Sequence, residues 1–316
     1  MRWKRCEIDF VLLTIIKYRV ERGQVDHAFS FTNCGINPVV MKTIVAATDF
    51  STSSRNALRY AADMAIDFGT DLLIVHATHI PVVSDVYFDL RMTMEDWQAE
   101  DQAQMNKLID KMRKDYGDAL KVRSKLKIGF GPDVIRELVS KGKIGAVVFG
   151  IAHTEKFNEI VFGSTGTDVA GTVSCPIIIV PEKAKYKQWK NLAFAFDQQH
   201  IPMGKGLRIL KEWTEAHESK IHFVNVMDTP FIEGDDTSLK PLYRKFQDAD
   251  VKTHFLPYRP NLTEETLLDW VRRHKASVMV IVARKHNFLW RMFHEPTTKK
   301  LAFNSPVPLI ILSDQR

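Results

Sequence analysis

The sequence predicts an α/β fold made of two tandem five-stranded parallel-sheet α/β sandwiches of the Rossmann-like type. The segment Lys42–Asp49 (KTIVAATD) reappears 148 residues later as Lys190–Asp197 (KNLAFAFD), and a second apolar run follows each copy. Each copy also closes on a proline-marked apolar run, Cys175–Val180 and Val307–Leu312. A repeat with so long a period indicates tandem domains rather than a solenoid.

In the first half, apolar runs alternate with stretches of helical periodicity. Thr43–Ala47 is too apolar to alternate, as expected of a strand covered on both faces. A helix capped by Ser51 or Ser53 should follow and end at Gly69. The other expected strands are Asp71–His76, Val122–Ile128, Ala146–Gly150 and Ile177–Val180, and the other helices are about Met94–Tyr116 and Gly131–Ser140.

The second half repeats this pattern. Its expected strands lie near 191–196, 221–226, 251–256, 278–282 and 308–312, and a helix near Leu262–Arg273 has a capping-box arrangement in Asn261 and Glu264. Strands that alternate with helices predict a parallel sheet with right-handed crossovers. We therefore expect one domain at 41–182 and a degenerate one at 190–316, joined by the charged linker Lys183–Gln188 and packed on each other as a pseudo-dimer.

Composition excludes several functional classes. The net charge of +6 comes from scattered basic residues without interleaved aromatics, so no nucleic-acid partner is expected. The apolar stretch Phe10–Ile16 is far too short to cross a membrane, so no membrane partner is expected either. Three cysteines without a CxxC pattern indicate a reducing, cytoplasmic compartment, and we expect no metal site.

The first forty residues neither repeat nor share a pattern with the rest of the chain. Two explanations stay open: an N-terminal arm, or an upstream stretch included by too early a start codon. We favour the second, and expect residues 1–40 to be dispensable for folding.

Three features of the first half should meet at the carboxyl edge of the sheet. Asp49 follows the first strand, Gly150 ends the fourth, and Gly163-Ser164-Thr165 opens the helix before the last. Ligands of open parallel sheets bind at this edge. A Gly-Ser-Thr helix start offers free N–H groups, hydroxyls and a positive dipole end to phosphate oxygens.

Each of these residues also has a structural interpretation. Asp49 alone serves equally well as a turn or cap residue, and Ser164 alone as a helix N-cap. His76 and His79, near a strand end, are expected to be solvent-facing loop residues. Only the joint arrangement favours a nucleotide site.

The same residues resemble the universal stress protein family. The resemblance rests on Asp49-Phe50-Ser51, Gly131-Pro132, Val147–Gly150 with His153, Gly163-Ser164 and Cys175–Val180, and it covers residues 41–181 and more faintly 190–314. It implies a sandwich of the adenine nucleotide alpha hydrolase-like kind and an ATP or other adenine-nucleotide site. It assigns Asp49 to the adenosine, Ala77 to the neighbourhood of the adenine, Gly150 and His153 to the loop, and Gly163, Ser164 and Thr165 to the phosphates.

The sequence departs from the family pattern in both halves. His153 stands where the family has a second glycine, so it either blocks the nucleotide or contacts a phosphate itself. In the second half the loop begins Ala283-Arg284, and Glu295-Pro296 replaces Gly-Ser. Pro296 lacks a backbone donor and Glu295 is negative, so this half is expected to have lost the nucleotide.

The sequence thus predicts a cytoplasmic universal stress protein, a regulatory binding module for the stress response with an adenine nucleotide in its first domain. We expect no catalytic residues, because no general base other than His153 and no Walker-type loop is present. Two alternatives stay open: a weak ATP-hydrolysing enzyme of the same fold, and a nucleotide-free structural or interaction protein. A homodimer is compatible with either.

Overall fold

The computed structural model describes residues 43–78, 94–151, 169, 172–196, 204–227, 239–259, 262–283 and 305–313. By its contacts the chain divides into residues 1–38 and 39–316, and the description below concerns the second unit. Residues 1–42 lie outside the described ranges, so the expectation that residues 1–40 are dispensable stays a prediction.

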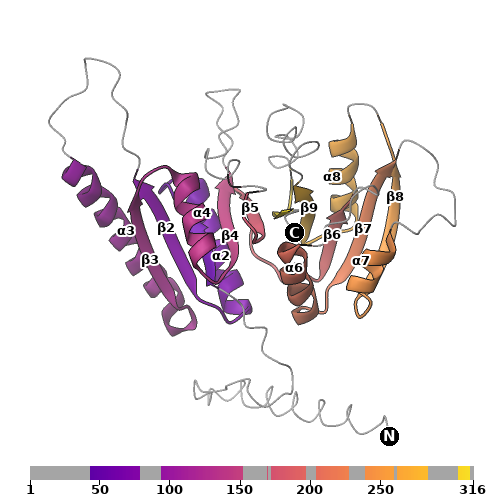
Figure 1. Ribbon diagram of the computed structural model, residues 1–316, viewed down its shortest axis with the longest axis horizontal. Coiled ribbons are helices and arrows are strands. Elements are labelled where there is room, and N and C mark those ends of the chain that lie inside the picture. Colours follow the sequence, from indigo (N-terminus) through magenta and orange to yellow (C-terminus); the bar gives the residue numbers. More distant parts are fainter. Residues whose placement is uncertain are drawn as a thin grey trace, which may run out of the picture. The chain divides into compact units, whose positions relative to one another are not determined.

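The described residues form one ten-stranded sheet in the order β3-β2-β1-β4-β5-β10-β9-β6-β7-β8 (Figure 1). The strands are β1 Thr43–Ala47, β2 Leu72–Thr78, β3 Val122–Ile128, β4 Ile144–Ile151, β5 Ile177–Pro181, β6 Asn191–Ala195, β7 Lys220–Met227, β8 Asp250–Pro257, β9 Val278–Ala283 and β10 Leu309–Ser313. The predicted α/β class with two five-stranded halves is confirmed. The halves share one sheet, however, instead of forming two.

The two halves of the sheet repeat one strand order. The first half runs 3-2-1-4-5 and the second, in corresponding strands, 8-7-6-9-10. All pairs are parallel except β5 with β10, which is antiparallel and joins the halves through Ile179↔Leu309 and Ile177↔Ile311. Both strands are fully buried, so their pairing satisfies backbone groups that an apolar edge would leave without partners. The boundaries 41–182 and 190–316 stay a prediction.

Helices cover both faces of the sheet. Residues of α2 (Thr52–Asp67), α3 (Met94–Tyr116), α6 (Lys205–Ala216) and α7 (Lys240–Lys245) share one core with Ile44 and Ala46, whereas α4 (Gly131–Lys141) and α8 (Thr263–Arg273) share the other with Val45. Alternate residues of β1 therefore enter two different apolar cores. This explains why the strand shows no alternation of polar and apolar residues.

The segment between the halves is packed rather than solvated. Trp189 is fully buried, and its Nε1 donates a hydrogen bond to the Tyr60 hydroxyl on α2 over 3.0 Å. Its ring contacts Trp213 of α6 edge-on at a centroid distance of 5.1 Å and Phe68 at 5.7 Å. One side chain thus contacts the C-terminal part of α2 and the first helix of the second half.

A polar cluster accompanies this aromatic contact. Asp67 at the end of α2 accepts hydrogen bonds from the Tyr186 hydroxyl (2.6 Å) and the Gln188 amide (3.0 Å), and His217 Nε2 lies 2.9 Å from its Oδ2. Burial acts to raise the pKa of Asp67, but these partners outweigh it, and the pKa lies below its ordinary value. Asn56 donates to the backbone carbonyls of Pro181, at the end of β5, and of Ala184, which ties α2 to the same segment.

The helix starts agree only in part with the sequence. Ser51 caps α2, as predicted, because its Oγ accepts from the Ser54 N–H over 3.2 Å. Pro132 lies in the first turn of α4, also as predicted. For α8 the expected capping box is wrong, since the cap is Leu262 and no side chain caps it. None of the helices in the described ranges combines the length and apolarity that crossing a membrane requires.

Three histidines gather beneath α8 in the second half. His222 on β7 and His254 on β8 face each other with Nδ1 and Nε2 3.0 Å apart, and the ring of His274 lies 5.4 Å from that of His254. Burial, then the neighbouring charges of His254, His274 and Lys220, lowers the pKa of His222 to about 4, against a smaller opposing effect of Asp250. Burial also lowers the pKa of His254.

We expect this cluster to make the fold acid-sensitive. The unfolded histidines titrate at the ordinary 6.5, so the unfolded chain binds more protons than the folded one below that value. The free energy of unfolding should therefore fall as the pH drops from about 6.5 to about 4, by on the order of 1–3 kcal/mol from this cluster. Urea unfolding at pH 7 and pH 4.5 measures this fall in the free energy of unfolding. His222→Gln should reduce the difference relative to the unaltered protein, and an undiminished difference would contradict the assignment.

Candidate functional site

The sheet brings three of the predicted site residues to one edge. Ala47 pairs with Val75, so Asp49 lies level with Ala77. Asp49 comes two residues after the end of β1, and Ala77 is the last but one residue of β2. Ala46 pairs with Val148, which places Gly150 on β4 at the level of Thr48. The strand order reverses between these strands, where open parallel sheets bind their ligands.

The turn after β1 is held by short-range hydrogen bonds. Asp49 Oδ1 accepts from the Ser51 N–H over 3.0 Å, an Asx-turn that also leads into the cap of α2. The Thr48 hydroxyl accepts from the Phe50 N–H and lies 3.1 Å from the Ser54 hydroxyl. The turn therefore fixes the direction in which the Asp49 side chain leaves the sheet.

Asp49 combines a structural role with an available charge. Its side chain is exposed although one oxygen serves the turn. Burial acts to raise its pKa, but hydrogen bonds from Ser51 and Ser54 outweigh burial, and the pKa lies below the ordinary value. An ionised carboxylate with a spare oxygen at this edge can accept hydrogen bonds from a hydroxyl or an amino group.

His76 is a fixed part of the site, and the expectation of a solvent-facing loop residue is wrong. It lies on β2 with its side chain 12% exposed. Its Nδ1 lies 2.8 Å from the Thr48 carbonyl oxygen and its Nε2 3.1 Å from Asp101 Oδ2 of α3, which also accepts from the Thr78 hydroxyl. The ring thus braces β1 against α3. The sequence placed His76 at the end of the expected strand, whereas β2 continues two residues further, to Thr78. His79 lies outside the described residues.

Gly150 lies directly against the first turn of α2. A Cβ atom built on it would be 2.4 Å from the Ser53 carbonyl oxygen and 2.6 Å from the Ser53 carbonyl carbon. The close approach that this glycine permits is therefore between β4 and the backbone of α2. Through that helix start, Gly150 supports the turn that presents Asp49.

The second half differs at the position equivalent to Gly150. The pairings Ala46↔Val148 and Phe194↔Val280 make Val282 the counterpart of Gly150, so the sequence-based match to Ala283 is off by one residue. Val282 faces the core of α6, as Gly150 faces α2. Helix α6 begins eight residues after Asp197, at Lys205, whereas α2 begins three residues after Asp49, at Thr52. Helix α6 thus starts five residues later after its aspartate than α2 does.

Two exposed apolar residues lie at and after the end of β3, and the sequence did not single them out. Ile128 pairs with Thr78 at the end of β3 and is 46% exposed, and Phe130, which precedes α4, is 47% exposed. Gly129 between them has φ 139° and donates its N–H to the Thr78 carbonyl. Ala77 itself packs on the α4 face of the sheet. Ile128 shares the α3 face with Thr78, so Ala77 and Ile128 offer apolar atoms on opposite faces of this edge.

The remaining predicted site residues lie outside the described ranges. These are His153, Gly163, Ser164 and Thr165 of the first half, and Asp197, Arg284, Glu295 and Pro296 of the second. Their assignments stay predictions.

Known proteins share both the family pattern and the fold. Residues 41–181 match the model of the universal stress protein family. These residues therefore form a domain of the universal stress protein family. The family domain ends at the last residue of β5, so it contains the whole first half of the sheet.

Solved structures show that the arrangement of two halves also occurs in other proteins. A universal stress protein from Archaeoglobus fulgidus is 16% identical, with a TM-score of 0.63, over 86% of this chain and 96% of its own. A candidate universal stress protein from Pseudomonas aeruginosa is 11% identical, with a TM-score of 0.52, over 87% of this chain and 94% of its own. A protein of unknown function from the same species is 12% identical, with a TM-score of 0.51, over 87% of this chain and 93% of its own. No curated protein matches the chain.

Proposed function

We propose that this universal stress protein is a cytoplasmic regulatory binding module of the stress response that holds one adenine nucleotide, ATP in the first instance, in its first half. The observation that carries the proposal is the alignment of Asp49, Ala77 and Gly150 at the carboxyl edge where the strand order reverses. The exposed carboxylate of Asp49 suits ribose hydroxyls. Ala77 on the α4 face, with the exposed ring of Phe130 at the start of α4, supplies apolar surface for the adenine ring.

The phosphates are assigned to Gly163, Ser164 and Thr165, which open a predicted helix with free backbone N–H groups. The second half carries Glu295-Pro296 at that point and Val282 at the place of Gly150. We therefore assign no nucleotide to it, and regard it as a scaffold for the first half.

Titration calorimetry with ATP tests this proposal. We expect one nucleotide per chain. Asp49→Asn keeps an oxygen for the turn but removes the charge, so the affinity should fall roughly tenfold with the melting temperature unchanged. Gly163→Glu should abolish binding by charge repulsion, whereas Glu295→Gly should create no second site.

Other outcomes separate the alternatives. Two nucleotides per chain would contradict the asymmetry between the halves, and no binding would leave the structural interpretation. Steady phosphate release on incubation with ATP would indicate an enzyme. His153→Gly in the same titration distinguishes a histidine that hinders the loop, for which affinity rises, from one that contacts a phosphate, for which affinity falls.

A further inference from the structure

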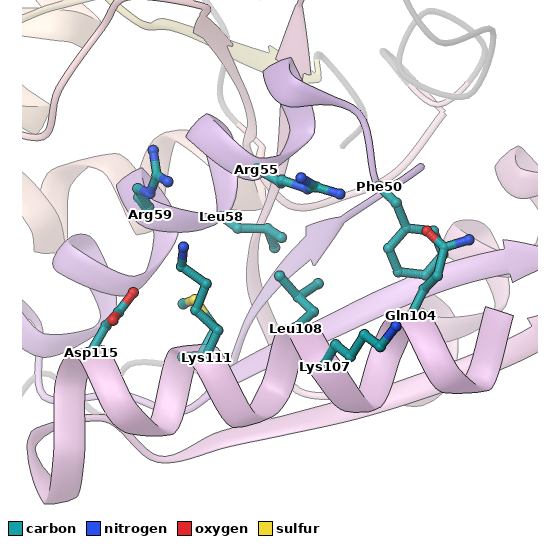
Figure 2. Close-up of a pocket in the computed structure, with 10 residues that line it drawn as sticks. Phe50, Arg55, Leu58, Arg59, Gln104, Lys107, Leu108, Lys111 and Asp115 are labelled. Carbon is teal, nitrogen blue, oxygen red and sulfur yellow. The ribbon is translucent and has the colours of Figure 1, made fainter. Parts of the chain in front are cut away.

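We propose that the groove between α2 and α3 is a second, separate binding site, and that it takes a small amphiphilic anion, an apolar chain or ring bearing a phosphate or carboxylate group. The groove has a volume of about 510 Å³, within the range of small-molecule sites. Figure 2 shows the side chains of the two helices lying along it. The proposal is independent of the nucleotide site.

The rim of the groove is strongly basic. Arg55 and Arg59 line it from α2, and Lys107 and Lys111 line it from α3, one helical turn apart in each case. All four side chains are exposed, and within the described ranges none forms an ion pair. Asp115 is the acidic residue of the lining. Four exposed cations around one hollow, with one acidic residue among them, favour an anionic ligand.

The floor of the groove is apolar. Leu58 and Met112 are buried at 1% and 3% exposure, and Leu108 is partly buried above them. In Figure 2, Leu58 and Leu108 face each other across the groove, and Lys111 extends from α3 toward α2. An inorganic ion would contact the rim and leave this floor in water. A ligand with an apolar part covers both, which is why we infer an amphiphile.

One end of the groove is closed by Phe50, whose backbone is held in the left-handed region at φ 61°. Few phenylalanines adopt this conformation, because it brings Cβ close to the backbone. Here the Thr48 hydroxyl accepts the Phe50 N–H and the ring packs on His76 at a centroid distance of 4.4 Å. The ring is therefore fixed as a wall, and Gln104 beside it offers a polar group to a headgroup.

The groove and the nucleotide site use different surfaces. The nucleotide is assigned to the strand ends and to Ala77 on the α4 face of the sheet, whereas the groove lies on the opposite face, between α2 and α3. Only the turn at Asp49-Phe50 adjoins both. ATP should therefore not displace a ligand from the groove.

The test uses the fluorescent probe 1-anilinonaphthalene-8-sulfonate, which has apolar rings and one anionic group, and its uncharged relative N-phenyl-1-naphthylamine. The anionic probe should bind at one site per chain and more tightly than the neutral one. Lys107→Gln with Lys111→Gln should weaken it roughly tenfold. The matched control, Arg113→Gln with Lys114→Gln, removes the same charge from exposed positions of α3 that do not line the groove, and should change the affinity less than twofold.

Competition then identifies the headgroup and the site. Displacement of the probe by dodecyl phosphate or by decanoate supports the proposal and tells a phosphate headgroup from a carboxylate one. Displacement by neither, equal affinity for the two probes, or equal effects of the two double variants would overturn it. Displacement by ATP would also overturn it, because the groove would then belong to the nucleotide site. Failure of ATP to bind at all would leave the groove proposal unaffected.

Discussion

Replacing Trp189 by alanine should lower the free energy of unfolding by about 3–5 kcal/mol and separate the unfolding of the two halves. Trp189 is fully buried and contacts the Tyr60 hydroxyl, Phe68 and Trp213. Its removal leaves a cavity between α2 and α6 and a buried hydroxyl without its donor. The main packing that couples the halves outside the sheet would be lost.

Calorimetry and urea unfolding followed by circular dichroism measure this effect. We expect one transition in the unaltered protein and two in the variant. Trp189→Phe keeps most of the packing and should retain a single transition. Trp270→Ala is a matched control, because it removes another buried tryptophan, 5% exposed, from the second half away from the junction. A single transition in Trp189→Ala, shifted by less than about 1 kcal/mol, would contradict the proposed coupling.

Replacing Gly150 by alanine should destabilise the protein by about 1–3 kcal/mol and weaken nucleotide binding. The new methyl group would meet backbone atoms of Ser53 at 2.4 and 2.6 Å, so β4 or the start of α2 must move. That movement disturbs the turn that presents Asp49. Thermal unfolding and ATP titration measure the two effects on the same samples.

Gly206→Ala supplies the matched control. It makes the same chemical change in α6, the counterpart of α2, but its Cβ would meet only Leu312, at an ordinary 3.5 Å or more. Since alanine also favours the helix, stability should stay unchanged or rise by up to about 1 kcal/mol. Equal effects of the two changes would mean that Gly150 has no special packing role.

Local pattern predicted much of the fold because the strands and helices follow elementary periodicity. The apolar run of β1 and the serine cap of α2 were readable from a few adjacent residues. The pattern of Lys183–Gln188 predicts a charged linker because lysines dominate it, whereas Tyr186 within it and Trp189 directly after it pack against partners more than a hundred residues away. Such contacts leave no local signal.

In the candidate site, too, the sequence predicted what strand order determines but not what depends on long-range contacts. The place of Asp49 and Gly150 at one sheet edge followed from strand order alone. That Val282, and not Ala283, corresponds to Gly150 depends on the register of β9 against β6, which a gap-free match of VIVARKH to VVFGIAH conceals. Likewise, the role of His76 became clear only once α3 brought Asp101 to its ring.

The antiparallel pairing of β5 with β10 has a consequence for assembly. Because both strands belong to one polypeptide, the association of the halves is unimolecular, and its effective concentration does not change on dilution. The pairing also covers the strand edges of both β5 and β10. In the described sheet only β3 and β8 remain as outer strands. Any self-association of whole chains must therefore use another surface, and it alone would respond to protein concentration.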